Sequence, residues 1–205
     1  MAQFFQIHPD NPQLRLIRQA VSILDAGGII VYPTDSCYAL GCHIGDKKAL
    51  DRIRMVRKLD ENHEFALMCS DLSQLSRYVK ITNEQYRLLK SITPGPYTFV
   101  LPATKEVPKR LQCEKRKTIG LRVPDSNIVQ MLLDQLGQPI YTTTLIMPGR
   151  NLPMNDTDEI REILEHRVDL IIDGGPCELE PTTILDLTKS QPEVLRQGRG
   201  SLDFL

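Results

Sequence analysis

Short, uninterrupted apolar runs alternate with segments of helical periodicity along most of this chain. The runs at 29–32 (IIVY) and 64–69 (EFALMC) are typical of strands that are buried on both faces of a sheet. Between them, Asp46 begins a helix that carries Leu50 and Ile53 at helical spacing. Because buried strands need helices to cover both faces, this alternation predicts an α/β fold.

The same patterns extend through the remainder of the 205 residues. Further helices are predicted at 12–26, 71–78, 82–92 and 156–166. Another predicted helix carries Ile128, Met131, Leu132 and Leu136 and stops at Gly137. Further strands are predicted at 97–103, 118–124, 139–147, 168–175, 182–187 and 193–198. We therefore expect a single domain, 1–205, with a mixed sheet of about seven strands and flanking helices. Closing strands joined by short loops must be antiparallel to each other or distant in the sheet.

Composition narrows the classes of function. The formal net charge of −1 gives no overall attraction to nucleic acid, so an anion site must come from local clustering. Five cysteines, an odd number without a Cys-x-x-Cys pair, argue against a disulfide framework and a structural zinc site. The N-terminal residues do not resemble a signal peptide, and no apolar run approaches the length of a membrane span. We expect a cytoplasmic protein without a tightly bound metal.

Basic residues are concentrated in two segments. Seven Lys and Arg side chains lie between Lys105 and Arg122, and four more lie between Arg52 and Lys58. Such groups often are simply solvated, or complement a helix dipole. Two clusters that flank strand ends also fit a surface for phosphates or a polyanion.

Hydroxyl side chains gather at predicted strand ends. Thr34 and Ser36 follow the first buried strand, and others lie at 142–144 and 182–183. In an open α/β sheet, ligands bind outside strand ends, where hydroxyls can contact phosphate or an amino acid. Threonine is also an ordinary strand residue, so both interpretations remain. The sequence has no P-loop, Rossmann glycine pattern, nucleophile elbow or metal-spaced histidine cluster, which favours a site that binds and positions its ligands.

Five segments in order resemble one known family. They read YPTDSCYALG (32–41), PGPYTFVL (94–101), TIGLRVPD (118–125), VDLIIDGG (168–175) and TTILDL (182–187). Together they resemble the YrdC-like threonylcarbamoyl-adenylate synthases over about 12–200, and the N-terminal segment is similar to the YciO branch. The resemblance implies a twisted, open YrdC-like sheet with a concave basic surface. It also implies an enzyme that joins L-threonine and bicarbonate into a carbamate and adenylates it with ATP and Mg²⁺, for a tRNA modification.

The resemblance also implies roles for individual residues. Tyr32 and Thr34 would line the threonine pocket, and Arg122 would hold a carboxylate or phosphate. The remaining contacts to substrate would come from Thr144, Thr182 and Arg196. Arg57 takes the position of a lysine that binds ATP phosphates, so Arg57 and Arg122 are the expected catalytic residues.

Two positions differ from the family pattern. Leu59 stands where the family has the second phosphate-binding cation, and Ile146 stands where it has an asparagine. Each lost charge-assisted contact typically costs about 1.5–3 kcal/mol. We therefore expect weak ATP binding and a weak or altered nucleotidyltransferase activity.

Two alternatives remain at this stage. The same pocket could serve an ATP hydrolase or transferase that acts on another acceptor. The chain could instead bind double-stranded RNA or tRNA, with a vestigial pocket, through a cluster of cations. That cluster consists of Lys109, Arg110, Lys115, Arg116 and Lys117. Convergence of Arg57, Arg122 and Thr34 on one cavity would distinguish the two ATP interpretations from RNA binding, which requires instead that the cations share an exposed face.

Overall fold

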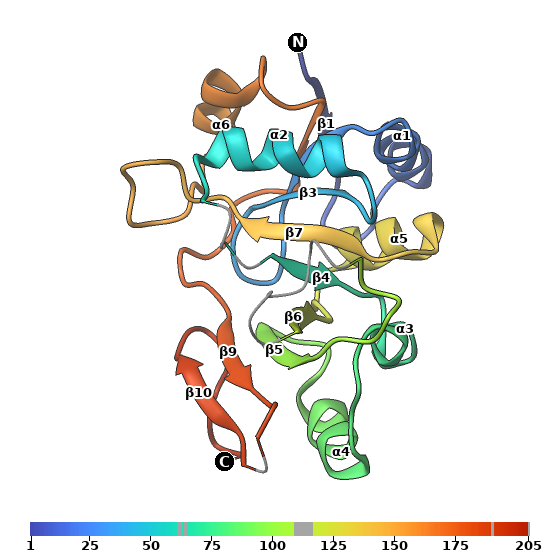
Figure 1. The fold of residues 1–205 in the computed structure, drawn as a ribbon. Coiled ribbons are helices and arrows are strands. Elements are labelled where there is room, and N and C mark those ends of the chain that lie inside the picture. The colour runs from blue at the N-terminus through green and yellow to red at the C-terminus, as the bar shows by residue number, and fades with distance from the viewer. Residues whose placement is uncertain (61–62, 64, 109–116, 190, 205) are drawn as a thin grey trace.

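The computed structural model describes residues 1–60, 63, 65–108, 117–189 and 191–204. Within them, ten strands form one mixed sheet in the order β1-β8-β2-β3-β7-β4-β6-β5-β9-β10. The strands are β1 (Gln3–Gln6), β2 (Ile29–Tyr32), β3 (Ala39–His43), β4 (Ala66–Met68), β5 (Tyr97–Pro102), β6 (Thr118–Arg122), β7 (Ile140–Thr144), β8 (Leu170–Asp173), β9 (Thr183–Asp186) and β10 (Glu193–Arg196). The helices are α1 (Leu14–Asp25), α2 (Lys47–Arg57), α3 (Leu72–Tyr78), α4 (Asn83–Ile92), α5 (Asn127–Leu136) and α6 (Thr157–Leu164). Figure 1 shows the strand directions turning along the sheet.

The predicted α/β class is confirmed, but the expected number of about seven strands is too low. The sequence patterns missed β1 and β3. Strand β1 forms because it pairs in parallel with β8, which lies far along the chain. Strand β3 contains Gly41, where a Cβ would come within 3 Å of Ile140, Tyr32 and Tyr141. Close packing from neighbouring strands therefore requires a glycine that is unusual in a strand.

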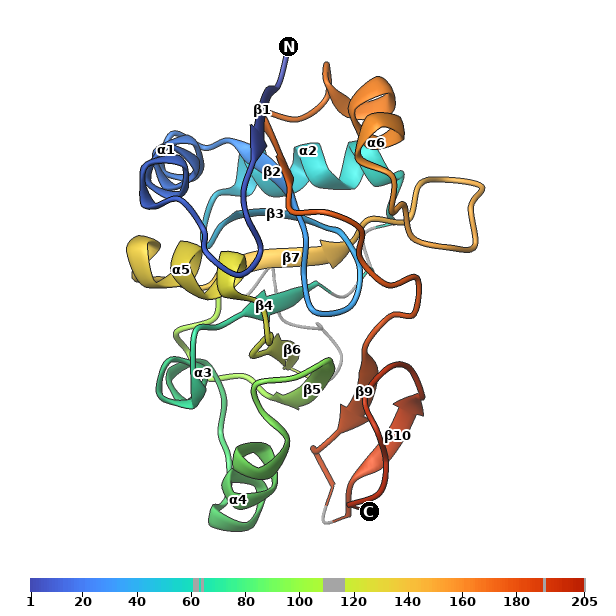
Figure 2. The same cartoon turned by 180° about the vertical axis from the view of Figure 1, so that it is seen from behind.

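The last three strands follow the rule expected from their short connections. Strands β9 and β10 are antiparallel neighbours. Strands β8 and β9 lie far apart in the sheet order, on either side of its centre. Figure 2 shows the connection between them running down the molecule.

Helices cover the two faces of the sheet unequally. On one face, α2, α3, α4 and α6 pack against strands from β2 to β9 in the larger core cluster. On the other face, α1 and α5 pack against strands that include β2, β4 and β8. This second cluster contains no residue of β5, β6 or β9 within the described residues. Among the described residues, no helix therefore covers this face of β5, β6 and β9, and we call the region of this face from β4 to β9 in the sheet order the open face (Figure 2).

None of the helices in the described part of the chain is long and apolar enough to cross a membrane.

Candidate functional site

Small side chains line one part of the open face, and we call this part the floor. Ala66 on β4 lies opposite Gly120 on β6 and opposite Thr142 on β7, so all three positions share one face. A Cβ on Gly120 would lie 3.3 Å from Cγ2 of Thr98 and 3.4 Å from Cβ of Ala66. Ala66, Thr98 and Gly120 are only half-buried although they belong to central strands. Small side chains therefore line this part of the open face.

Arg122 ends β6 and is surrounded by the loop that follows β2. Its Nη2 donates to Oδ1 of Asp35 at 2.6 Å, to Oγ of Ser36 at 3.1 Å and to Oγ1 of Thr34 at 3.5 Å. The Arg122 and Asp35 side chains are only 6% and 5% exposed. The Arg122 Nε is buried and has no hydrogen-bond partner among the described residues. A buried donor of this kind is costly unless a ligand or water satisfies it.

Thr34 uses its hydroxyl within its own loop. The hydroxyl donates to the carbonyl of Cys37 at 2.7 Å and accepts from the amide of Ser36 at 3.2 Å. Thr34 also lines a cavity of about 210 Å³ that includes residues of the α5 N-terminus and Cys177. Arg57 and Arg122 are not among the residues that line this cavity. Thr34 therefore meets Arg122, but the three-residue convergence on one cavity is not seen here.

Tyr32 lies beneath the open face. Its side chain is fully buried, and its hydroxyl donates to Oγ1 of Thr142 at 2.8 Å. Burial raises the pKa of Tyr32 to about 12, while the Thr142 hydrogen bond and the charge of Arg122 act in the opposite direction. Tyr32 thus supports Thr142 as a neutral hydrogen-bond donor.

Arg196 and Thr182 lie beside the small residues of the open face. Nε and Nη2 of Arg196 donate to the carbonyl of Thr182 at 3.1 and 2.8 Å, and Nη2 also donates to its hydroxyl at 3.2 Å. The Thr182 hydroxyl in turn lies 2.8 Å from the hydroxyl of Thr98 on the floor. Partial burial lowers the pKa of Arg196, and the charge of Arg122 acts in the same direction. Two arginines that repel each other in this way favour a bound anion.

Cys37 lies among these cations and was not identified as a site residue from the sequence. Burial raises the pKa of its thiol to about 11, although the positive charges of Arg122, Arg196 and Arg199 oppose the shift. The thiol is therefore protonated at neutral pH and is a poor nucleophile. This chemistry fits the expected site, which positions ligands without forming a covalent bond to them.

The side chain of Arg57 extends from the last residue of α2 to the C-terminal end of β7. Its Nη1 donates to the hydroxyl of Thr143 at 3.3 Å and to the carbonyl of Thr144. Burial lowers the pKa of Arg57 to about 10, which leaves it charged at neutral pH. Nε2 of His63 lies 3.1 Å from the same Thr143 hydroxyl. The four histidines are far apart in the sequence, and only the folded chain brings His63 to this strand end.

The two departures from the family pattern have different surroundings. Leu59 is partly buried and packs against the larger core cluster. Ile146 is half-buried, and its amide donates to the carbonyl of Thr144 at 2.9 Å. An apolar side chain therefore lies two residues after Thr144, at the position where the family pattern has an asparagine.

The structure describes only one residue of the proposed RNA-binding cluster. Lys109, Arg110, Lys115 and Arg116 lie outside the described residues. Lys117 is exposed directly before β6, with a φ of 52°. The RNA interpretation stays a prediction.

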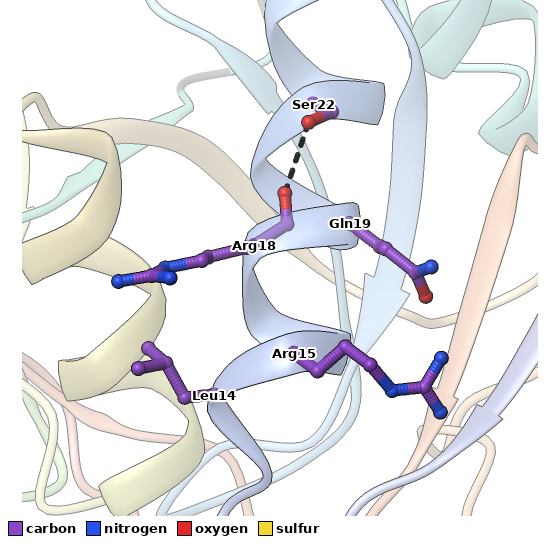
Figure 3. A pocket seen from close by; sticks show the side chains of 5 residues that line it. All are labelled: Leu14, Arg15, Arg18, Gln19 and Ser22. Atoms are coloured by element: carbon purple, nitrogen blue, oxygen red, sulfur yellow. Dashed lines mark hydrogen bonds between the residues drawn. The ribbon is translucent and has the colours of Figure 1, made fainter.

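A separate hollow of about 510 Å³ lies on the outer surface of α1. Leu14, Arg15, Arg18, Gln19 and Ser22 line it. In Figure 3 the Arg15 and Arg18 side chains point in different directions, and the Ser22 hydroxyl donates to the Arg18 carbonyl at 3.0 Å. Nε of Arg18 donates to Gln135 of α5 at 3.2 Å. Because its polar groups do not converge, this hollow is a poorer candidate site than the open face.

Comparison with known proteins places these features in one family. The family model for Sua5, YciO and YrdC, described as "Telomere recombination", matches residues 22–198. The crystal structure of Escherichia coli YciO is 56% identical, covers 99% of this chain and 98% of its own, and has a TM-score of 0.95.

Two further similarities concern proteins whose names indicate an activity or a ligand. A threonylcarbamoyl-AMP synthase of Vibrio vulnificus is 28% identical over 186 residues, which are 89% of this chain and 98% of that protein. The crystal structure of P. abyssi Sua5 complexed with L-threonine is 26% identical and has a TM-score of 0.87. The match covers 95% of this chain and 57% of the longer Sua5 chain.

Proposed function

The chain belongs to the Sua5, YciO and YrdC family, and on this premise we propose that it binds ATP with Mg²⁺, and L-threonine with bicarbonate, at the open face. The observation that carries the proposal is the pair Arg122 and Arg196 beside a floor of small residues. A ligand anion would meet both guanidinium groups. The small floor leaves room for the remainder of a nucleotide or amino acid.

The reaction would be the one that the family resemblance implies. The threonine amine attacks bicarbonate, water is lost, and a carbamate forms. A carbamate oxygen then attacks the α-phosphorus of ATP, and pyrophosphate leaves with the electrons of the broken P–O bond. Arg122 would hold a carboxylate or phosphate, and Arg57 and Arg196 would stabilise phosphate charge. Because the carbamate oxygen attacks ATP directly, no covalent intermediate on the protein is needed.

The Mg²⁺ would arrive with the nucleotide. Among the described residues, no group of three or more His, Cys, Asp or Glu side chains is placed to hold a metal ion. Mg²⁺ commonly binds through substrate phosphates and waters with one or two carboxylates, so a dedicated protein cage is not required. The ion would neutralise phosphate charge during pyrophosphate release.

We expect this activity to be weak or altered. Leu59 packs against the core and gives no cation to the phosphates, and Ile146 offers no hydrogen bond from its side chain. Each missing charge-assisted contact would cost about 1.5–3 kcal/mol, or one to two powers of ten in affinity.

Calorimetry with Mg-ATP, with and without L-threonine and bicarbonate, tests the proposal, together with an assay for pyrophosphate release. Replacement Arg122→Gln should abolish binding. Arg15→Gln, on the outer surface of α1, is a matched control that should bind as the unmodified protein does. Absence of ATP binding in the unmodified protein, or equal binding by Arg122→Gln, would contradict the proposal.

A further inference from the structure

Two basic side chains meet at one hydroxyl at the end of β7. Nη1 of Arg57 lies 3.3 Å from Oγ1 of Thr143, and Nε2 of His63 lies 3.1 Å from the same oxygen. Arg57 comes from the last residue of α2, whereas His63 belongs to the connection that leads to β4. Thr143 alternates with Thr142 along β7, so this pair approaches the strand end from the helix-covered face. Arg57 also donates to the carbonyl of Thr144, and it is the residue to which the proposed function assigns phosphate charge.

The His63 ring is held in this position by its neighbours. It makes an edge-to-face contact with Phe65, with ring centroids 5.2 Å apart and an interplanar angle of 85°. Phe65 is itself buried, and the guanidinium of Arg54 lies 5.6 Å from its ring centroid. A half-buried histidine supported in this way is positioned before a ligand arrives.

Leu59 cannot take the same role. Its side chain packs partly buried against the larger core cluster. Lys58, which precedes it, is exposed and ends α2 in the left-handed conformation with a φ of 49°. In the described part of this connection, His63 is the basic side chain that accompanies Arg57 to Thr143.

We propose that His63 is a phosphate-contacting residue that supplies the second cation missing at Leu59. This inference rests on the proposed function, because it assigns a subsite for the ATP phosphates. The protonated imidazole donates from Nε2 to a phosphate oxygen, while Arg57 donates beside it. The neutral imidazole can instead accept from the Thr143 hydroxyl, and the subsite then holds one cation.

The affinity for phosphate should therefore depend on pH through His63. Histidine is the side chain whose charge most often changes between about pH 5 and 8. The groups around it are Arg57 at Thr143, Arg54 on Phe65, and Asp60, whose carbonyl accepts from the His63 amide at 3.3 Å. Glu61 and Glu64 flank His63 in sequence and lie outside the described residues. Lower pH should strengthen phosphate binding.

Calorimetric titration with Mg-ATP at about pH 6 and about pH 8 tests this dependence. At the lower pH the unmodified protein should bind Mg-ATP about tenfold more tightly than His63→Gln does, as expected for one charge-assisted contact. At the higher pH the affinities of the two proteins should become equal. His63→Lys keeps a fixed charge and should bind tightly at both. His166→Gln changes a histidine that is 71% exposed near α6 and should leave binding unaltered.

The variant His63→Gln keeps an amide that can contact Thr143, and its melting temperature reports whether the fold is intact. A difference between the unmodified protein and His63→Gln that is the same at both pH values would overturn the inference. If the unmodified protein binds no ATP at either pH, the proposed function fails. In that case, titration with inorganic triphosphate tests the inference separately, because a contact from His63 to phosphate needs no nucleoside. Binding of triphosphate that is weaker in His63→Gln supports the inference. Equal binding by the two proteins, or no binding by the unmodified protein, overturns the inference.

Discussion

Arg122 and Asp35 form an ion pair of 2.6 Å whose two side chains are almost completely buried. The second carboxylate oxygen of Asp35 accepts from the amide of Asp125 at 3.0 Å. One carboxylate therefore joins the loop after β2 to the end of β6 and to the approach to α5. It also partly neutralises the arginine that we propose to bind the substrate anion.

Replacement Asp35→Asn should lower the free energy of unfolding by about 3 kcal/mol, because it leaves the buried Arg122 charge without its partner. Added phosphate or ATP should restore part of the loss by binding Arg122. Urea denaturation measures both effects. The exposed pair Arg150–Glu159 is the control, and Glu159→Gln should change stability little. Equal effects of the two substitutions would show that the buried pair is not important for stability.

Replacement Thr34→Val should destabilise the fold by about 1–3 kcal/mol, because the hydroxyl that donates to the Cys37 carbonyl is lost inside a buried loop. Thr34→Ser keeps that donor and should retain most of the stability. Chemical denaturation of the two variants distinguishes them. Unchanged stability of Thr34→Val with weaker ligand binding would instead mean that the hydroxyl mainly serves the ligand.

Replacement Gly120→Val should block the open face. Already a Cβ at this position meets Thr98 and Ala66 at 3.3 and 3.4 Å, and the two extra methyl groups would extend into the space above the floor. We expect ATP affinity to fall by at least about tenfold, the equivalent of 1.4 kcal/mol, with a much smaller effect on folding. Calorimetry measures the affinity, and the melting temperature is the control. Normal ATP binding by a folded Gly120→Val protein would place the ligand elsewhere.

Stability should fall as pH rises from about 9 towards 11. Burial raises the pKa of Cys37 to about 11, so the unfolded chain loses this proton first. The folded state then binds more protons than the unfolded state, and each such group lowers stability by up to about 1.4 kcal/mol per pH unit. Cys42 and Cys177, whose pKa values burial raises to about 12, act in the same direction. Urea midpoints of Cys37→Ala across this range should decline less steeply than those of the unmodified protein, and an identical slope would contradict the assignment.

The cations at 109–117 predict RNA binding that depends strongly on salt. If about four phosphates are contacted, the slope of log K against log salt should be roughly −3 to −4. Replacement of Lys115, Arg116 and Lys117 by alanine should flatten it by about two to three units. Filter binding with double-stranded RNA or tRNA checks this. Equal binding by the triple variant at every salt concentration would remove the nucleic-acid interpretation.

Local interactions explain why much of the fold could be predicted. Thr82 and Gln85 form the expected capping box, in which each side chain bonds the backbone of the other residue. Asp46, Asp71 and Asp156 cap their helices as predicted. These partners lie within four residues of each other, so their contacts need no knowledge of the sheet.

The sequence by itself therefore determined the alternation of strands and helices, the helix ends and, through the ordered segments, the family. Only the tertiary structure decided that Arg122 meets Asp35, that His63 returns to Thr143 and that β1 lies beside β8. Each of these contacts joins residues far apart in sequence. They depend on the order of the strands and on which part of a face the helices leave open, and neither is encoded in a local pattern.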